Sequence, residues 1–140
     1  MPVPYPEYLV APMRQELADV GARECRTSAD VDDVMKQPGT TMMVVNSVCG
    51  CAAGKARPGI AMALQHEVKP SNVATVFAGA DIEATDRARQ LMTGFAPSSP
   101  SIALFRDGQL VYMIERRDIE QRTAEGIADL LTLAFDKHCA

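Results

Sequence analysis

Two cysteines separated by a single glycine, Cys49 and Cys51 around Gly50, stand between an apolar run and a segment of small residues. A thiolate that attacks a disulfide forms a mixed disulfide, which a second nearby thiol can resolve by closing an internal disulfide. Gly50 suits the position between them because glycine adopts backbone angles that residues with a side chain resist. The spacing therefore favours thiol–disulfide exchange. It leaves two alternatives, a pair of buried inert thiols or two ligands of a metal whose other ligands lie elsewhere.

The expected surroundings of this pair favour a reactive sulfur. If a strand precedes the cysteines and a helix follows them, the helix N-terminus stabilises a thiolate and lowers the pKa of the cysteine. Lys55 and Arg57 follow within two turns and add positive potential. Asn46 and Ser47 precede the pair and can hydrogen-bond the turn or cap the helix. Arg57 has two further interpretations, as a solvated charge or as the group that binds a carboxylate of an anionic small thiol.

Hydrophobic spacing and turn residues predict the elements that must position the cysteines. Residues 7–20 show helical spacing, although Pro12 predicts a kink or a start near residue 11. Residues 41–46 are apolar without alternation, as expected of a central strand covered on both faces. The other expected elements are an edge strand at 22–27, a helix at 29–36 capped by Ser28, a helix from the cysteines to about residue 66 with a bend near Pro58-Gly59, a strand at 73–78, a helix at 81–92, strands at 101–105 and 110–115 joined by an Asp-Gly hairpin turn, and a closing helix at 120–136.

This order of elements predicts an α/β fold with a mixed, five-stranded sheet. Strands separated by helices are expected to run parallel, and the terminal hairpin adds antiparallel strands. Helices then cover both faces of the sheet, with an added helix at the N-terminus. The cysteines fall at the carboxyl end of a central strand, where open α/β sheets place their sites. The chain of 140 residues is expected to form one domain, 1–140.

Composition narrows the partners and the cellular compartment. The net charge is −4, and the Lys and Arg residues are scattered, so nucleic acid is not an expected partner. No apolar run approaches the roughly 18 residues of a membrane span, and residues 1–6 do not resemble a signal peptide, so we expect a cytoplasmic protein that does not contact membranes. In that reducing setting, cysteines are more often catalytic or free than paired. Cys25 and Cys139 are interpreted as passive thiols, and the oligomeric state is left open.

Several sequence runs together resemble the bacilliredoxin family, and the resemblance spans nearly the whole chain. It implies a thioredoxin fold and removal of the small thiol bacillithiol from mixed disulfides on cytoplasmic client proteins, with possible disulfide isomerase activity. It also implies that Cys49 attacks and Cys51 resolves, and that the small thiol is the only co-substrate, without a cofactor or metal. The runs that carry it are 45–54 (VNSVCGCAAG), 56–58 (ARP), 97–101 (PSSPS), 8–17 (YLVAPMRQEL) and 118–122 (DIEQR).

Pro100 and Ser99 form a second candidate part of the site. Thioredoxin-fold proteins place a cis-proline opposite the reactive cysteine, just before the strand that opens the terminal hairpin, and Pro100 occupies that place. Ser99 is then expected to offer backbone groups to an extended client or to the peptide-like part of a small thiol. A second class of function remains open at this stage, in which Cys49 and Cys51 serve a non-catalytic metal or iron–sulfur carrier or a redox sensor.

Overall fold

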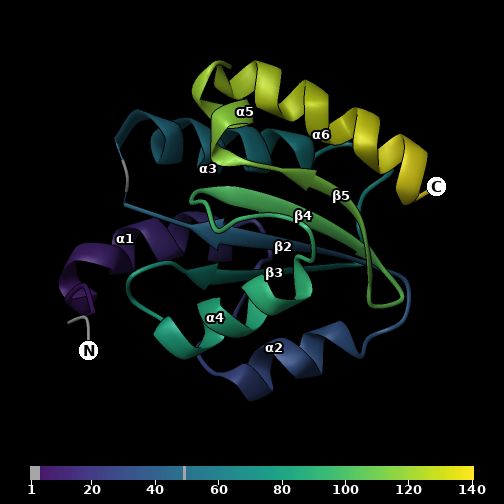
Figure 1. Cartoon of the computed structure of the whole chain (residues 1–140). Helices are drawn as coiled ribbons and strands as arrows, with labels where there is room; N and C mark the ends of the chain where they lie inside the picture. Colours follow the sequence, from purple (N-terminus) through teal and green to yellow (C-terminus); the bar gives the residue numbers. More distant parts are fainter. Residues whose placement is uncertain (1–3, 49) are drawn as a thin grey trace.

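The computed structural model describes residues 4–48 and 50–140, so the roles predicted for Cys49 lie outside the described residues. Within this part of the chain, helices and strands alternate up to a terminal hairpin and two closing helices (Figure 1). The elements are α1 (Glu7–Ala18), β1 (Arg23–Glu24), α2 (Ser28–Met35), β2 (Thr40–Asn46), α3 (Gly50–Ala63), β3 (Asn72–Phe77), α4 (Ile82–Leu91), β4 (Ser101–Arg106), β5 (Gln109–Ile114), α5 (Arg116–Glu120) and α6 (Ala124–His138).

The strands form the mixed, five-stranded sheet that the sequence predicts. Their order is β1-β3-β2-β4-β5. Strands β1, β3 and β2 run parallel, whereas β4 runs antiparallel to β2 and β5 antiparallel to β4. All seven residues of β2 are buried, as its apolar run without alternation indicates. This central strand ends at Asn46, three residues before the first cysteine of the pair.

Helices cover both faces of the sheet, with α3, α5 and α6 on one side and α2 and α4 on the other (Figure 1). A hydrophobic core lies on each face of the sheet, and successive side chains of β2 point alternately into one core and the other. Met42 and Val44 face the core that contains residues of α3 and α6, whereas Met43 and Val45 face the core that contains residues of α2 and α4. Helix α3, which carries Cys51, thus packs against both the sheet and α6.

The predicted start of the first helix at residue 7 is confirmed, whereas the predicted cap of the second helix is wrong. Helix α1 begins at Glu7 and continues through Pro12, so the alternative start near residue 11 is excluded. Proline removes the bond that residue 12 would give to the carbonyl of Tyr8, but Tyr8 is an exposed residue, so water can replace that bond. Helix α2 begins one residue early, because the side chain of Thr27, not of Ser28, accepts from the N–H of Asp30.

The predicted closing helix at 120–136 corresponds to α6, which begins four residues later, and a short helix that the sequence did not predict precedes it. Glu115 and Asp118 form a reciprocal capping box that starts the short helix α5. Thr123 then caps α6 by accepting from the N–H of Gly126. The predicted hairpin turn is confirmed, since Asp107 and Gly108 both have positive φ, at 48° and 81°.

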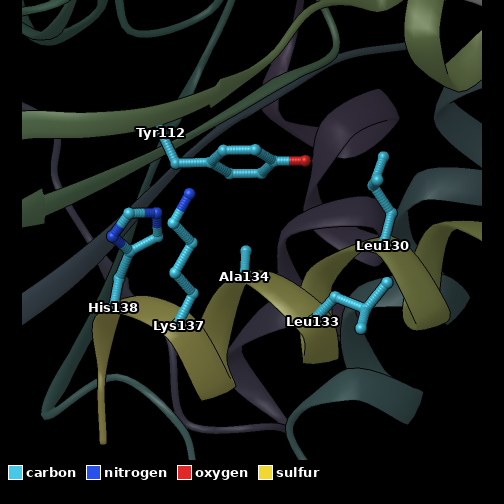
Figure 2. Close-up of a pocket in the computed structure, with 6 residues that line it drawn as sticks. All are labelled: Tyr112, Leu130, Leu133, Ala134, Lys137 and His138. Carbon is cyan, nitrogen blue, oxygen red and sulfur yellow. The ribbon is translucent and has the colours of Figure 1, made fainter.

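A cavity of about 160 Å³ lies between β5 and α6, lined by side chains that Figure 2 shows: Tyr112, Leu130, Leu133, Ala134, Lys137 and His138. Tyr112 pairs with Leu104, and Leu104 pairs in turn with Met42, which lies toward the amino end of β2. The cavity is therefore at the opposite end of the central strand from the cysteine segment. Within residues 4–48 and 50–140, no helix is long and apolar enough to cross a membrane.

Candidate active site

The backbone turns sharply between β2 and α3, and Gly50 makes that turn. Gly50 has a φ of +48°, and its N–H donates to the carbonyl of Val48 at 2.8 Å. A Cβ at this position would meet nothing within 4 Å, so the backbone angle and not crowding calls for glycine. Cys51 follows in the first turn of α3, and its thiol is exposed. The turn thus brings an accessible sulfur to the carboxyl end of the central strand.

Asn46 and Ser47 anchor the strand side of this turn, where both residues are only 2% exposed. The side-chain oxygen Oδ1 of Asn46 accepts from the N–H of Ser47 at 2.9 Å and from Nη1 of Arg57 at 3.1 Å. Its amide Nδ2 donates to the carbonyl of Met13 in α1 at 3.2 Å. A single buried amide therefore links the strand end, helix α1 and helix α3.

Arg57 is buried and is not the solvated charge that was one of its sequence interpretations. Its Nε donates to Oε2 of Glu16 at 2.8 Å, and its Nη1 donates to the carbonyl of Ser47 at 2.9 Å as well as to Asn46. Because a guanidinium can leave water only when its donors find acceptors, these partners account for its burial. That Arg57 binds a substrate carboxylate stays a prediction, and the carboxylate that the structure shows on it belongs to Glu16.

Helix α1 is tied to the same edge of the sheet through a second ion pair. Arg14 donates to both carboxylate oxygens of Asp81, at 2.7 and 2.8 Å, and its guanidinium lies 5.3 Å from the ring centre of Phe77. Asp81 also accepts from the N–H of Phe77, which pairs with Asn46 across the sheet. Both side chains of the pair are almost fully buried. This bidentate pair therefore fixes α1 beside the residues that support the cysteine turn.

The Ser99–Pro100 peptide bond is cis, as the sequence predicts. In the antiparallel pairing of β2 with β4, Ser101 lies opposite Val45. Pro100 directly precedes Ser101, and Val45 is one residue before the end of β2 at Asn46. The loop that contains the cis-proline thus lies beside the strand end that leads into the cysteine pair.

Residues of α5 contact both the cysteine helix and the proline loop. Lys55 of α3 donates through Nζ to the carbonyl of Glu120 at 2.9 Å. Arg116 donates through Nη1 to the carbonyl of Ser99 at 3.1 Å and through Nε to Oε1 of Glu120 at 2.6 Å. Lys55 of α3 and Arg116 of α5 therefore both contact Glu120, one through its carbonyl and the other through its carboxylate.

The sequence interpretation missed Glu16 and Arg116 as residues near the site. Their only sequence signal is their place in or beside the runs 8–17 and 118–122, which resemble the bacilliredoxin family. Nothing in local spacing links Glu16 with Arg57, which is 41 residues away, or Arg116 with Ser99, which is 17 residues away.

Two other cysteines lie away from the turn. Cys25 is completely buried, and this burial raises the pKa of its thiol to about 11. Burial also raises the pKa of Cys139. Both shifts disfavour the reactive thiolate. In the part of the chain that the structure describes, no three side chains of His, Cys, Asp or Glu gather as a metal site requires.

Comparisons with known proteins agree with this arrangement. Residues 5–139 match the family model described as Disulphide isomerase. The chain is 60% identical to a bacilliredoxin of Koribacter versatilis over 136 residues, covering 96% of this chain and 94% of that protein. It is 52% identical to a bacilliredoxin of Cytophaga hutchinsonii over 133 residues, covering 95% and 98% of the two chains.

Solved structures share the fold at low sequence identity. The thioredoxin of Malassezia sympodialis superposes with a TM-score of 0.61 at 12% identity, over 86% of this chain and 92% of that one. The oxidised thioredoxin of Plasmodium falciparum gives a TM-score of 0.57 at 12% identity, over 86% and 100% of the two chains. These likenesses establish a thioredoxin fold. With the sequence relatives, they show that the chain belongs to the bacilliredoxin family and is a thiol–disulfide oxidoreductase.

Proposed function

We propose that this protein removes a low-molecular-weight thiol of the bacillithiol type from mixed disulfides on cytoplasmic client proteins. The observation that carries this proposal is the exposed thiol of Cys51, which lies at the carboxyl end of the central strand. The cis-proline loop beside that strand end adds support, as do the relatives named bacilliredoxin. In this proposal the small thiol is the only co-substrate, and neither nucleic acid nor membrane takes part.

The reaction we propose begins at Cys49. Its thiolate attacks the small-thiol sulfur of the mixed disulfide. The disulfide bond to the client breaks, and the client sulfur leaves with the electron pair and takes up a proton. A new disulfide then joins Cys49 to the small thiol. The Cys51 thiolate attacks the Cys49 sulfur and releases the small thiol as a thiolate, which leaves an internal Cys49–Cys51 disulfide.

The cycle closes with a reductant of the same chemical class. Two further molecules of the small thiol reduce the internal disulfide in successive exchanges and leave as a small-thiol disulfide. A small thiol can also resolve the Cys49 mixed disulfide directly, without Cys51. On a client with a non-native internal disulfide, the same attack reshuffles the pairing. We include this isomerase activity as a secondary function of the site, in keeping with the description of the family model.

The division of labour between the cysteines is testable with two variants. Cys49→Ala is expected to abolish release of the small thiol, because the attacking sulfur is lost. Cys51→Ala is expected to accumulate a mixed disulfide on Cys49 and to keep activity when excess small thiol resolves it. Mass spectrometry of each variant, after exposure to a protein mixed disulfide, measures the trapped species.

The same variants also test the carrier alternative. Complete and equal loss of activity in both would contradict the separate roles of attack and resolution. Zinc or iron bound at stoichiometric level to the purified protein, and lost from either variant, would favour a metal carrier instead of an oxidoreductase that acts on small-thiol disulfides.

A further inference from the structure

Arg116 lies against the loop that holds the cis-proline, and its guanidinium is fixed there. The backbone N–H of Arg116 approaches Oγ of Ser98 at 3.4 Å, and Nη1 donates to the carbonyl of Ser99 at 3.1 Å. Its Nε donates to the carboxylate of Glu120 at 2.6 Å, one helical turn further along α5. A guanidinium held at two of its nitrogens keeps one orientation, which is what recognition of a planar anion requires.

The contact with Ser99 changes what the loop can offer a client. An extended peptide that pairs with a residue in antiparallel fashion exchanges two hydrogen bonds with it, one to its carbonyl and one from its N–H. In this structure the carbonyl of Ser99 already accepts from Arg116. That Ser99 offers its backbone groups to an extended client stays a prediction, and Arg116 occupies one of the two lone pairs of its carbonyl oxygen.

Of the two arginines at the site, Arg116 is the accessible one, although its charge is paired with that of Glu120 at 2.6 Å. Arg57 is buried and paired with Glu16, so little of its guanidinium is open to direct contact with a substrate. Arg116, by contrast, keeps 39% of its side chain exposed. Lys55 of α3 contacts the carbonyl of Glu120 at the other end of α5. An anionic group of a substrate beside Ser99 would thus lie near Arg116, which contacts the Ser99 carbonyl.

We propose that Arg116 is a specificity-determining residue, whose guanidinium, seated on the Ser99 carbonyl beside cis-Pro100, selects small thiols that carry a carboxylate over uncharged ones. This assignment rests on the proposed function, because it concerns the small-thiol half of the mixed disulfide. The guanidinium attracts the carboxylate while the small-thiol sulfur is held at the cysteine pair, and it takes no part in the exchange of electrons.

The test compares two mixed disulfides that differ only in the small thiol. One cysteine-containing peptide is coupled to mercaptosuccinate, which carries two carboxylates, and to 2-mercaptoethanol, which carries none. For each substrate, kcat/KM for release of the small thiol is measured with the full chain. Arg116→Gln is expected to lower the ratio of the two values, anionic over neutral, by about five- to tenfold, as loss of a partly exposed charged hydrogen bond does.

Arg117 supplies a matched control on the same helix. It also loses a charge when replaced by Gln, but its side chain is 78% exposed and pairs with Glu115, not with the proline loop. Arg117→Gln is expected to leave the ratio within about twofold. Arg116→Lys restores the charge without the planar fork, so it is expected to recover part of the preference.

The possible results separate the two proposals. If the wild-type protein releases neither small thiol, the proposed function is wrong and the assignment of Arg116 falls with it. If the wild-type protein releases both, but Arg116→Gln lowers both values equally or leaves their ratio unchanged, only the specificity role is overturned. An equal fall for Arg117→Gln would show a general effect of net charge and would also overturn it.

Discussion

Arg57 and Glu16 form one ion pair, but the two side chains have very different surroundings. The side chain of Arg57 is 10% exposed and that of Glu16 is 51% exposed. Removing the guanidinium takes donors from the buried oxygens of Asn46 and Ser47, whereas changing the carboxylate leaves Arg57 its hydrogen bonds to those two oxygens. Substitution of Arg57 is therefore expected to lower the free energy of unfolding much more than substitution of Glu16.

The inequality gives a prediction for the free energy of unfolding. Arg57→Met is expected to destabilise the fold by about 2–3 kcal/mol, because the buried oxygens of Asn46 and Ser47 each lose a charged donor. Glu16→Gln is expected to lower the same free energy by less than about 1 kcal/mol, as is usual for an exposed partner. Urea denaturation of both variants measures the difference. Similar small losses in both would mean that the oxygens of Asn46 and Ser47 find other donors.

The buried thiol of Cys25 predicts a pH-dependent protection. Its pKa is raised to about 11 by burial, so only about one thiol in a thousand is ionised at pH 8. The neutral thiol contributes stability that is present below its unfolded pKa and is lost as the pH rises through about 11. In native protein at pH 8, Cys25 is expected to react with iodoacetamide far more slowly than the exposed Cys51, and in urea at a similar rate.

Peptide mapping by mass spectrometry at timed intervals measures both rates. The comparison in urea is the control, since it removes burial and leaves the local sequence unchanged. Equal labelling of Cys25 and Cys51 in the native protein would show that the core around β1 opens readily, which would contradict the complete burial of Cys25.

At the scale of helices, α3 and α6 meet closely at Gly59. A Cβ at Gly59 would lie 2.9 Å from the carbonyl oxygen of Ala124 and 2.9 Å from Cβ of Ile127. A Cβ at Gly54, in the same helix, would meet nothing within 4 Å. These glycines thus form a matched pair, because both occupy α3 and only one touches a neighbouring helix.

The two substitutions are expected to change stability in opposite directions. Gly54→Ala should stabilise the fold by about 0.5–1 kcal/mol through helix propensity. Gly59→Ala should destabilise it by about 1–3 kcal/mol, because α6 must move away. Thermal and urea unfolding of both variants give the comparison. Stabilisation by Gly59→Ala would show that α6 adjusts its position without loss of packing.

The elements that the sequence predicts well are those with a strong local signal. The apolar run of β2 and the Asp107-Gly108 turn depend on neighbouring residues alone, so they could be read directly. Helix α5 could not, because its five residues are mostly charged and only Ile119 is buried. The helical spacing of 120–136 extended the predicted helix backward over the break, and the cap at Thr123 that separates the helices was overlooked.

The parts of the site differ in the same way. Gly50 and the cis-proline at Pro100 could be predicted because their position in the chain and in the topology already determines the backbone they need. Glu16 and Arg116 could not be predicted from spacing, because each acts through a contact between distant segments. Long side chains such as these can reach several partners, and only the packed fold selects one.

At the scale of the whole molecule, helix α1 is part of the support of the site and not an appendage to the sheet. Three of its residues contact the edge where β2 and β3 end: Met13 through its carbonyl, Arg14 through Asp81 and Glu16 through Arg57. The pair of Arg14 with Asp81 joins positions 67 residues apart. Displacement of α1 would therefore disturb the cysteine turn even though α1 contains no cysteine.

The contacts around the cysteine turn come from segments distributed between Met13 and Glu120. While a ribosome is making the chain, Cys49 and Cys51 emerge long before Arg116 and the proline loop exist to flank them. A nascent chain thus carries the two thiols without the groups that we expect to choose their partner. If Arg116 and the proline loop select the small thiol as we propose, this preference is gained only when those segments have folded against the cysteines. The substrate preference of the thiols then reports how far the molecule has assembled.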